Sequence, residues 1–256
     1  MLSANLVTAL WIFILPLIAI LLPIWLGQRF GLFASRRSNK LADAPINSAV
    51  AGSLGLFAFM LAFTFQIVGD RFSKRRELFL NEVSEIRTSY LYAGLIPEPT
   101  RSQARKMIVS YVDVRVQLLH DISLLKEAEI KSQKILDSLW SYAETLSAQD
   151  RSSESYSLFT SSVSQMISLF NERITVTLQT KLPQMILYVL AFVGFFSMLS
   201  LGFYFGITGK VSFAINLVFA ITFAAVMWLI FALDNPEVGL IQVDQSALVR
   251  LRGELR

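Results

Sequence analysis

The 256-residue chain contains no cysteine and only one histidine, His120. Without cysteine it can form neither a disulfide bond nor a thiolate nucleophile. One histidine cannot form a multi-histidine metal site. It also cannot act as the base of a nucleophile system and serve as a metal ligand at the same time. We therefore expect no metal site and no cofactor, and we expect His120 to be packed or solvated.

The carboxylates lie close to basic residues along the chain. Glu82 and Glu85 precede Arg87 on one predicted helix, and Glu172 is followed by Arg173. This spacing favours solvated or ion-paired helix faces over acid–base catalysis. The sequence therefore does not indicate an enzyme.

Formal charge is also missing from four long apolar segments. They run from Asn5 to Leu26, from Ile46 to Gly69, from Pro183 to Ile207 and from Val211 to Leu233. Each holds about 20 residues or more, and with a rise of ~1.5 Å per residue each can cross a hydrocarbon core of ~30 Å as a helix. The segments predict an all-α integral membrane protein with two transmembrane helices before a polar insert and two after it. Pumps and ion-coupled carriers usually keep titratable groups at depth, so a carrier is disfavoured.

Composition supports the same class of protein. Hydrophobic residues make up 54% of the chain and charged residues 16%, and the formal net charge is +4. The basic residues gather at the ends of the apolar segments, where orientation in the membrane accounts for them. The lipid bilayer is therefore the expected partner, and nucleic acid is not indicated.

Four regions are expected along the chain. Residues 1–69 hold transmembrane helices 1 and 2, residues 70–182 a helical domain, residues 183–233 transmembrane helices 3 and 4, and residues 234–256 a C-terminal tail. The first apolar segment lacks a basic leading region and is longer than a signal-peptide core, so we expect it to remain as a membrane helix.

The insert is expected to be a helical bundle. No glycine or proline interrupts residues 70–92, so the second span should continue as one helix as far as a turn at residues 94–99. Thr100 is the expected N-cap of the next helix. Apolar stripes predict three further helices, the first with Met107, Tyr111, Val114, Leu118, Ile122 and Leu125, the second with Ile135, Leu139, Tyr142 and Leu146, and the third with Phe159, Val163, Met166, Phe170, Ile174 and Leu178.

Basic residues set the expected orientation. They are more numerous beside the insert and the C-terminus than on the opposite side, which predicts a cytoplasmic insert and cytoplasmic termini. If only the short first loop governed insertion, its basic residues would give the opposite orientation. The first group is Arg71, Lys74, Arg75, Arg76, Arg87, Arg173, Lys181, Arg250 and Arg252, and the second is Arg29, Arg36, Arg37, Lys40 and Lys210.

The second span carries small and neutral residues along one helical stripe. One interpretation is close helix packing through small residues. The other is a pore lining, with an aromatic constriction at Phe59 or Phe63 that passes partly hydrated ions and gates by dewetting. Four helices of one chain enclose too little space, so such a pore would lie on the axis of a cyclic homo-oligomer. The stripe consists of Ser48, Gly52, Gly55, Phe59, Ala62 and Gln66.

Asp234 is the main polar candidate at a membrane boundary. It follows the fourth span and is expected to pair with the basic residues that begin at Arg71. One possible role is a structural anchor. The alternative is a ring at the cytoplasmic mouth of a pore, where the carboxylates attract cations.

These landmarks together resemble the bacterial bestrophin-like membrane protein family over nearly the whole chain. The residues that carry the resemblance are Gly52–Phe65, Asn81-Glu82, Ser89-Tyr90-Leu91, Leu95–Pro99, Tyr111-Val112-Asp113, Asn171-Glu172-Arg173 and Leu233–Gly239. The resemblance to bestrophins implies a pentameric ion channel of the bacterial inner membrane with a cytoplasmic insert, cytoplasmic termini and an apolar neck on the second helix. Two departures are a much shorter cytoplasmic region and the lack of an acidic run after the last span, so calcium gating is not expected. Glu237 stands where the family tends to place an aromatic residue.

The sequence therefore predicts a homo-oligomeric ion channel with small monovalent ions as its cargo. A non-conducting scaffold or regulator that binds a soluble partner through the helical domain is the alternative, and a carrier is the third possibility. Subunit number, ion selectivity and gating signal are left open.

Overall fold

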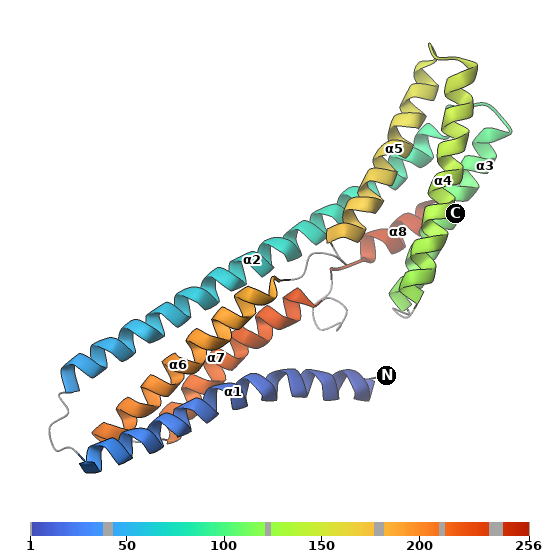
Figure 1. Cartoon of the computed structure of the whole chain (residues 1–256). Helices are drawn as coiled ribbons and strands as arrows, with labels where there is room; N and C mark the ends of the chain where they lie inside the picture. The colour runs from blue at the N-terminus through green and yellow to red at the C-terminus, as the bar shows by residue number, and fades with distance from the viewer. Residues whose placement is uncertain are drawn as a thin grey trace. The chain divides into compact units, whose positions relative to one another are not determined.

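The computed structural model describes residues 2–37, 43–120, 124–176, 182–209, 213–235 and 243–255. Within them the chain forms α-helices and no strand, which confirms the all-α prediction (Figure 1). The helices are α1 (Leu2–Arg37), α2 (Asp43–Tyr92), α3 (Thr100–His120), α4 (Leu125–Gln149), α5 (Glu154–Ile174), α6 (Gln184–Thr208), α7 (Phe213–Asp234) and α8 (Ser246–Leu255).

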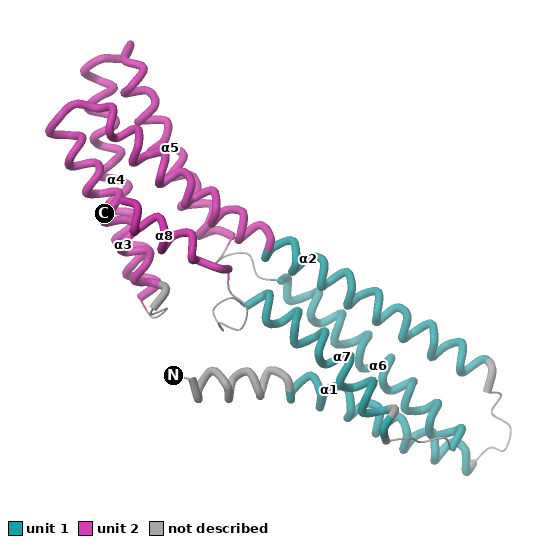
Figure 2. The backbone as a smooth tube through the Cα atoms, turned by 180° about the vertical axis from the view of Figure 1, so that it is seen from behind, with its two compact units in different colours: residues 1–72, 181–242 teal, residues 73–180, 243–256 magenta. Residues whose placement is uncertain are grey.

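The chain divides into two compact units, coloured separately in Figure 2. Unit 1 comprises Met1–Phe72 and Lys181–Gln242, and unit 2 comprises Ser73–Thr180 and Val243–Arg256. Four helices of the described chain are long and apolar enough to cross a membrane, which confirms the four predicted spans. These helices lie at Ile14–Arg36, Pro45–Tyr92, Gln184–Thr208 and Asn216–Asp234.

Glycines bring α1 and α6 into close contact in unit 1. A Cβ atom on Gly202 would collide with the carbonyl oxygen of Ile24, and one on Gly206 would lie 2.5 Å from that of Gln28. Gly27 and Gly31 of α1 face the backbone of α6 in the same way. Small residues let two membrane helices approach until their backbones touch. This packing accounts for the continuation of α1 as a helix past Leu26, where the predicted first span ended.

The core of unit 1 also holds one face of α2. Phe57, Leu61, Thr64 and Val68 are each at most 3% exposed. The Phe57 ring stacks on Phe223 of α7 with the ring centroids 5.2 Å apart. The Ser197 hydroxyl of α6 donates to the backbone oxygen of Ser53 over 2.9 Å. Apolar packing and this interhelical hydrogen bond therefore fix which face of α2 points inward.

Unit 2 is a helical bundle with a single large apolar core. The stripe predicted on α5 is confirmed, because Phe159, Val163, Met166 and Phe170 are all buried. Ile174 is half-buried, and Leu178 lies outside the described residues. The predicted helix without a break as far as the turn before α3 is also observed, since α2 extends to Tyr92.

The buried faces of α3 and α4 differ from the predicted ones. α3 ends at His120, so Leu125 belongs to α4, and Ile122 lies outside the described residues. Small and polar side chains occupy the helix contacts, whereas the sequence pattern was read from large apolar residues alone. The buried set on α3 is Ala104, Ile108, Tyr111, Val112, Arg115 and Val116, and on α4 it is Ala128, Ser132, Leu136, Leu139, Ala143 and Leu146.

The start of α3 and the C-terminal segment also differ in detail from expectation. α3 begins at Thr100 itself, and the Glu98 carboxylate accepts the backbone N–H of Ser102 over 3.2 Å, in place of the predicted Thr100 cap. Residues 234–256 were expected to form a tail, but α8 packs into the core of unit 2 through Leu248 and Leu251.

Candidate functional site

The predicted stripe on α2 lies on the face that the rest of unit 1 leaves uncovered. Phe59 is 65% exposed and Phe63 54% exposed, opposite the buried Phe57 and Leu61. The other stripe residues, Ser48, Gly52, Gly55, Ala62 and Gln66, are exposed as well.

Close packing within one chain does not explain this stripe. A Cβ atom placed on Gly52 or Gly55 would have nothing within 4 Å among the residues that the structure describes. The small residues that do bring helices together are Gly27 and Gly202, on α1 and α6. The first interpretation of the stripe is therefore wrong for contacts inside unit 1.

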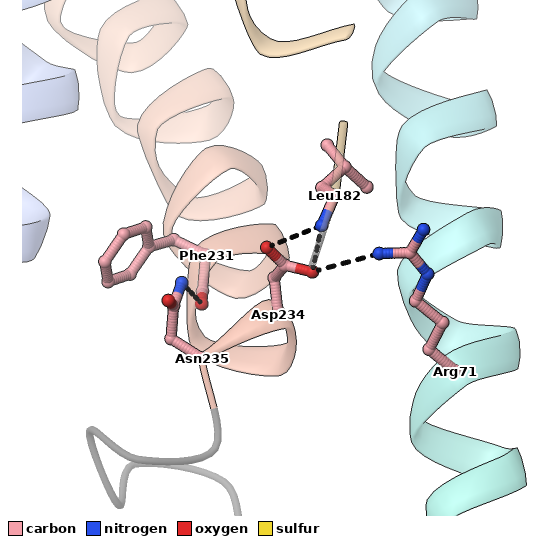
Figure 3. A network of polar contacts seen from close by, with 5 residues as sticks. All are labelled: Arg71, Leu182, Phe231, Asp234 and Asn235. Atoms are coloured by element: carbon pink, nitrogen blue, oxygen red, sulfur yellow. Dashed lines mark hydrogen bonds and ion pairs between the residues drawn. The ribbon is translucent and has the colours of Figure 1, made fainter. Parts of the chain in front are cut away.

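Asp234, the last residue of α7, joins three segments of unit 1 (Figure 3). Its Oδ1 lies 3.5 Å from Nη1 of Arg71 on α2 and accepts the backbone N–H of Leu182 over 3.2 Å. The side chains of Arg71 and Asp234 are only 24% and 12% exposed. The side chain of Asn235 donates to the carbonyl oxygen of Phe231 over 3.0 Å, which satisfies an orphan acceptor of the helix end.

The expected pair between Asp234 and Arg71 is therefore present. A carboxylate that is mostly buried and already holds a guanidinium and a backbone N–H favours the anchoring role. The pair ties the end of α7 to α2 and to the residue before α6.

A second polar cluster lies inside unit 2, around Glu82 of α2. Its Oε1 accepts the hydroxyl hydrogen of Tyr111 over 2.6 Å, and its Oε2 lies 3.3 Å from Nη2 of Arg115 and 3.1 Å from Nε of Arg173. Glu82 is 1% exposed and Tyr111 is fully buried. Of the two expected surroundings for Glu82, a solvated or an ion-paired face, the ion-paired one is observed. Its partners are distant in sequence, and the nearby Arg87 pairs instead with Glu254 over 3.5 Å.

Electrostatics in this cluster favour a charged Glu82. The cluster lies beyond Gly69, where the charge-free membrane segment ends. Burial alone would raise the pKa of Glu82, but the charges of Arg115 and Arg173 and the hydrogen bonds from Tyr111 and Arg115 lower it below its ordinary value of 4.5. Burial and the charge of Glu82 raise the pKa of Tyr111 well above 10.0, so Tyr111 stays protonated and donates.

The cluster is built from segments that carry the family resemblance. Glu82, Tyr111 and Arg173 each belong to one of the quoted segments, although 29 residues separate the first two. In addition, Asp113 pairs with Arg252 of α8 over 2.6 Å, and Glu172 pairs with Lys74 over 3.5 Å. Sequence spacing cannot reveal such distant partners, whereas the shared landmarks pointed to these positions.

The Glu82 cluster is a structural element and does not form a substrate pocket. The cavity beside it, lined in part by Arg115 and Arg173, measures about 20 Å³. That volume holds about one water molecule. In the described part of the chain, no group of three or more His, Asp or Glu residues is placed to hold a metal ion.

A model of the Bestrophin-like domain matches residues 15–248. The chain belongs to the Bestrophin-like family. The matched region includes the α2 stripe, the Asp234 anchor and the Glu82 cluster of this Bestrophin-like protein.

Solved structures show the same fold. One variant of a bacterial bestrophin homologue from Klebsiella pneumoniae superimposes with a TM-score of 0.66 at 15% identity, covering 95% of this chain and 98% of that one. A second variant gives 0.67 at 15% identity, with coverages of 94% and 97%. A crystal structure described only as a membrane protein gives 0.65 at 16% identity, with coverages of 95% and 94%. No curated protein matches the chain. The family, the fold and the four apolar helices together establish a membrane protein.

Proposed function

We propose that this Bestrophin-like protein is a homo-oligomeric ion channel whose axial pore is lined by α2 and passes small monovalent ions. The supporting observation is the uncovered face of α2, which carries Phe59 and Phe63 while the opposite face is buried. In a cyclic assembly each copy can turn this face toward the axis. A pentamer follows from the resemblance to bestrophins, and the resemblance favours a channel over an enzyme.

The chemistry of the stripe suits an ion path with an apolar neck. Gly52 and Gly55 leave room beside the backbone, whereas Phe59 and Phe63 present large rings on the same face. Such a constriction has no fixed charge and can gate by dewetting. Phe59 and Phe63 are therefore the proposed neck, and Ser48, Gly52, Gly55, Ala62 and Gln66 are the proposed remainder of the lining.

Arg71 and Asp234 are proposed to lie at the cytoplasmic mouth, where they hold the end of α7 against α2. The excess of basic residues beside the insert supports unit 2 and the termini on the cytoplasmic side of the inner membrane. In this arrangement the uncharged face of α2 crosses the bilayer, and unit 2, which encloses the Glu82 cluster, lies outside it.

Flux through sealed liposomes tests the channel. Purified protein should make the vesicles permeable to small ions, and Phe59→Ala or Phe63→Ala should raise the flux because each widens the neck. Phe192→Ala is a matched control, since Phe192 is 64% exposed but lies on α6. It should leave the flux unchanged.

Vesicles that stay impermeable across ions, pH and voltage would contradict the channel. A monomeric particle in mild detergent would do the same, because one chain cannot enclose an axial pore. Recovery of a stoichiometric soluble partner with impermeable vesicles would favour the scaffold.

A further inference from the structure

Asp70 continues the uncovered face of α2. It lies one turn beyond Gln66 and three turns beyond Phe59, so a helix with 3.6 residues per turn places all three on one side. Asp70 is exposed, and its Oδ1 accepts a hydrogen bond from Nε2 of Gln66 over 2.8 Å. The bond holds the carboxylate along the same stripe as the proposed neck.

No other formal charge lies on the span. Residues 46–69 contain no Asp, Glu, Lys, Arg or His, so Asp70 is the first charged residue met along the stripe after Phe59 and Phe63. Asp70 is therefore the fixed charge nearest the proposed neck on this side of α2. The basic residue one turn further on, Lys74, lies 3.7 Å from Glu77 and 3.5 Å from Glu172, and both carboxylates offset its charge.

The neighbouring basic residue points elsewhere. Arg71 is turned by about 100° from Asp70 around the helix. Its guanidinium is 3.5 Å from Asp234, inside unit 1, and that pairing neutralises it. The Asp234 anchor thus withdraws the positive charge that would otherwise offset Asp70 at this end of the stripe.

We propose that Asp70, repeated in every copy around the axis, forms a ring of carboxylates that makes the pore select small monovalent cations over anions. This inference rests on the proposed function, since the ring exists only if α2 lines a shared axis. Rings of acidic side chains attract cations and repel anions at a pore mouth. In water, a single carboxylate about 7 Å away raises the local occupancy of a monovalent cation roughly threefold and lowers that of a monovalent anion roughly threefold.

Reversal potentials in a KCl gradient test the ring. The wild-type channel in a planar bilayer should favour K⁺ over Cl⁻, Asp70→Asn should reduce the permeability ratio at least roughly threefold, and Asp70→Glu should keep it. Asp137→Asn is the matched control, because Asp137 is an exposed residue on α4 that accepts from Gln133 Nε2 over 2.9 Å with the same four-residue spacing. It should leave the ratio unchanged.

The lack of cysteine in the chain permits a second test on one folded variant. Asp70→Cys supplies a unique thiol, and a sulfonate-bearing methanethiosulfonate reagent should restore the K⁺ preference that the substitution removes. A trimethylammonium-bearing reagent should shift the reversal potential the opposite way. Because both measurements use the same protein before and after labelling, misfolding cannot account for a difference between them.

Conducting wild-type protein whose permeability ratio is insensitive to Asp70→Asn and to both reagents would overturn the Asp70 ring but leave the channel intact. A wild-type channel that prefers Cl⁻ would also overturn it. Wild-type protein that conducts nothing would overturn the proposed function and the ring together.

Discussion

Tyr111 donates its hydroxyl hydrogen to the carboxylate of Glu82 over 2.6 Å, at the centre of unit 2. The carboxylate also holds two guanidinium groups, from Arg115 and Arg173. Two positive charges and one negative charge thereby meet beside the apolar core of unit 2. Such a cluster requires every donor to be in place, because a buried charge without its partners is costly.

Removal of the phenol hydroxyl should therefore destabilise unit 2. Tyr111→Phe keeps the ring in its apolar site but takes away one charge-assisted hydrogen bond, at an expected cost of about 1.5–3 kcal/mol in the free energy of unfolding. Urea unfolding measures the change through Trp140, the single tryptophan between residues 73 and 180, after the others are replaced by phenylalanine.

Tyr142→Phe is the control for this prediction. Tyr142 is half-buried on α4, and loss of its hydroxyl should change the free energy of unfolding by no more than about 0.5 kcal/mol. Equal losses in the free energy of unfolding from the two substitutions would contradict a stabilising role for the hydrogen bond to Glu82.

Acid should weaken the same cluster. The folded-state pKa of Glu82 is lower than the ordinary value of 4.5, so its contribution to stability is fully present above about pH 4.5 and is lost as the pH falls through the folded-state pKa. Arg173→Met removes one of the charges that lower this pKa. The variant should therefore begin to lose stability at a higher pH than the wild type.

Unfolding midpoints measured from pH 3 to pH 7 check this shift, because that range includes the ordinary carboxyl pKa of about 4. Arg151→Met, in the exposed loop before α5, should leave the acid profile unchanged. An identical acid onset in Arg173→Met and the wild type would contradict the coupling between Arg173 and Glu82.

Loss of the Asp234 anchor should destabilise the protein more than loss of a shorter ion pair on the surface. Asp234→Ala removes both the contact with Arg71 and the acceptor for the Leu182 N–H, at an expected cost of about 1.5–3 kcal/mol. Asp234→Asn keeps an acceptor for that N–H and should cost less. Thermal unfolding in detergent micelles gives the order of the variants.

The matched surface pair is Glu127 with Lys131, whose charged atoms are only 2.7 Å apart but whose side chains are 59% and 55% exposed. Glu127→Ala should cost no more than about 0.5 kcal/mol, because solvent screens an exposed pair. A greater loss of stability in Glu127→Ala than in Asp234→Ala would show that a short distance between the charged atoms contributes more than their burial.

Local signals carried the predictions that the structure confirms. The apolar stripe of α5 and the turn at residues 94–99 depend on residues a few positions apart, so their spacing alone predicts them. The buried face of α3 includes Arg115, which a hydrophobic pattern assigns to solvent. Only the fold brings Glu82 to it, 33 residues away in sequence.

The α2 stripe shows a different limit. Its spacing correctly suggested one continuous face, and the spacing fits close packing and a pore lining equally well. Which of the two interpretations holds depends on whether another helix packs against Gly52 and Gly55. The positions of α6 and α7 in the fold decide that. The structure identifies instead the glycines of α1 and α6 as the close-packing set.

Substitution at this glycine contact should separate α1 from α6. In Gly202→Ala the added methyl group meets the carbonyl oxygen of Ile24, and backbone atoms on both sides cannot move away as a flexible side chain can. Overpacking of this kind costs typically about 1–3 kcal/mol. Thermal unfolding in micelles should show the loss, and a crosslink between cysteines introduced on α1 and α6 should form more slowly.

Gly253→Ala is the control, since a Cβ atom there has nothing within 4 Å among the described residues. Gly253 lies within α8, where alanine is favoured over glycine by roughly 0.5–1 kcal/mol. The two substitutions add the same methyl group to a helix and should change stability in opposite directions. If Gly202→Ala were tolerated as well as Gly253→Ala, the α1–α6 contact would have to be looser than the backbone approach observed at Ile24.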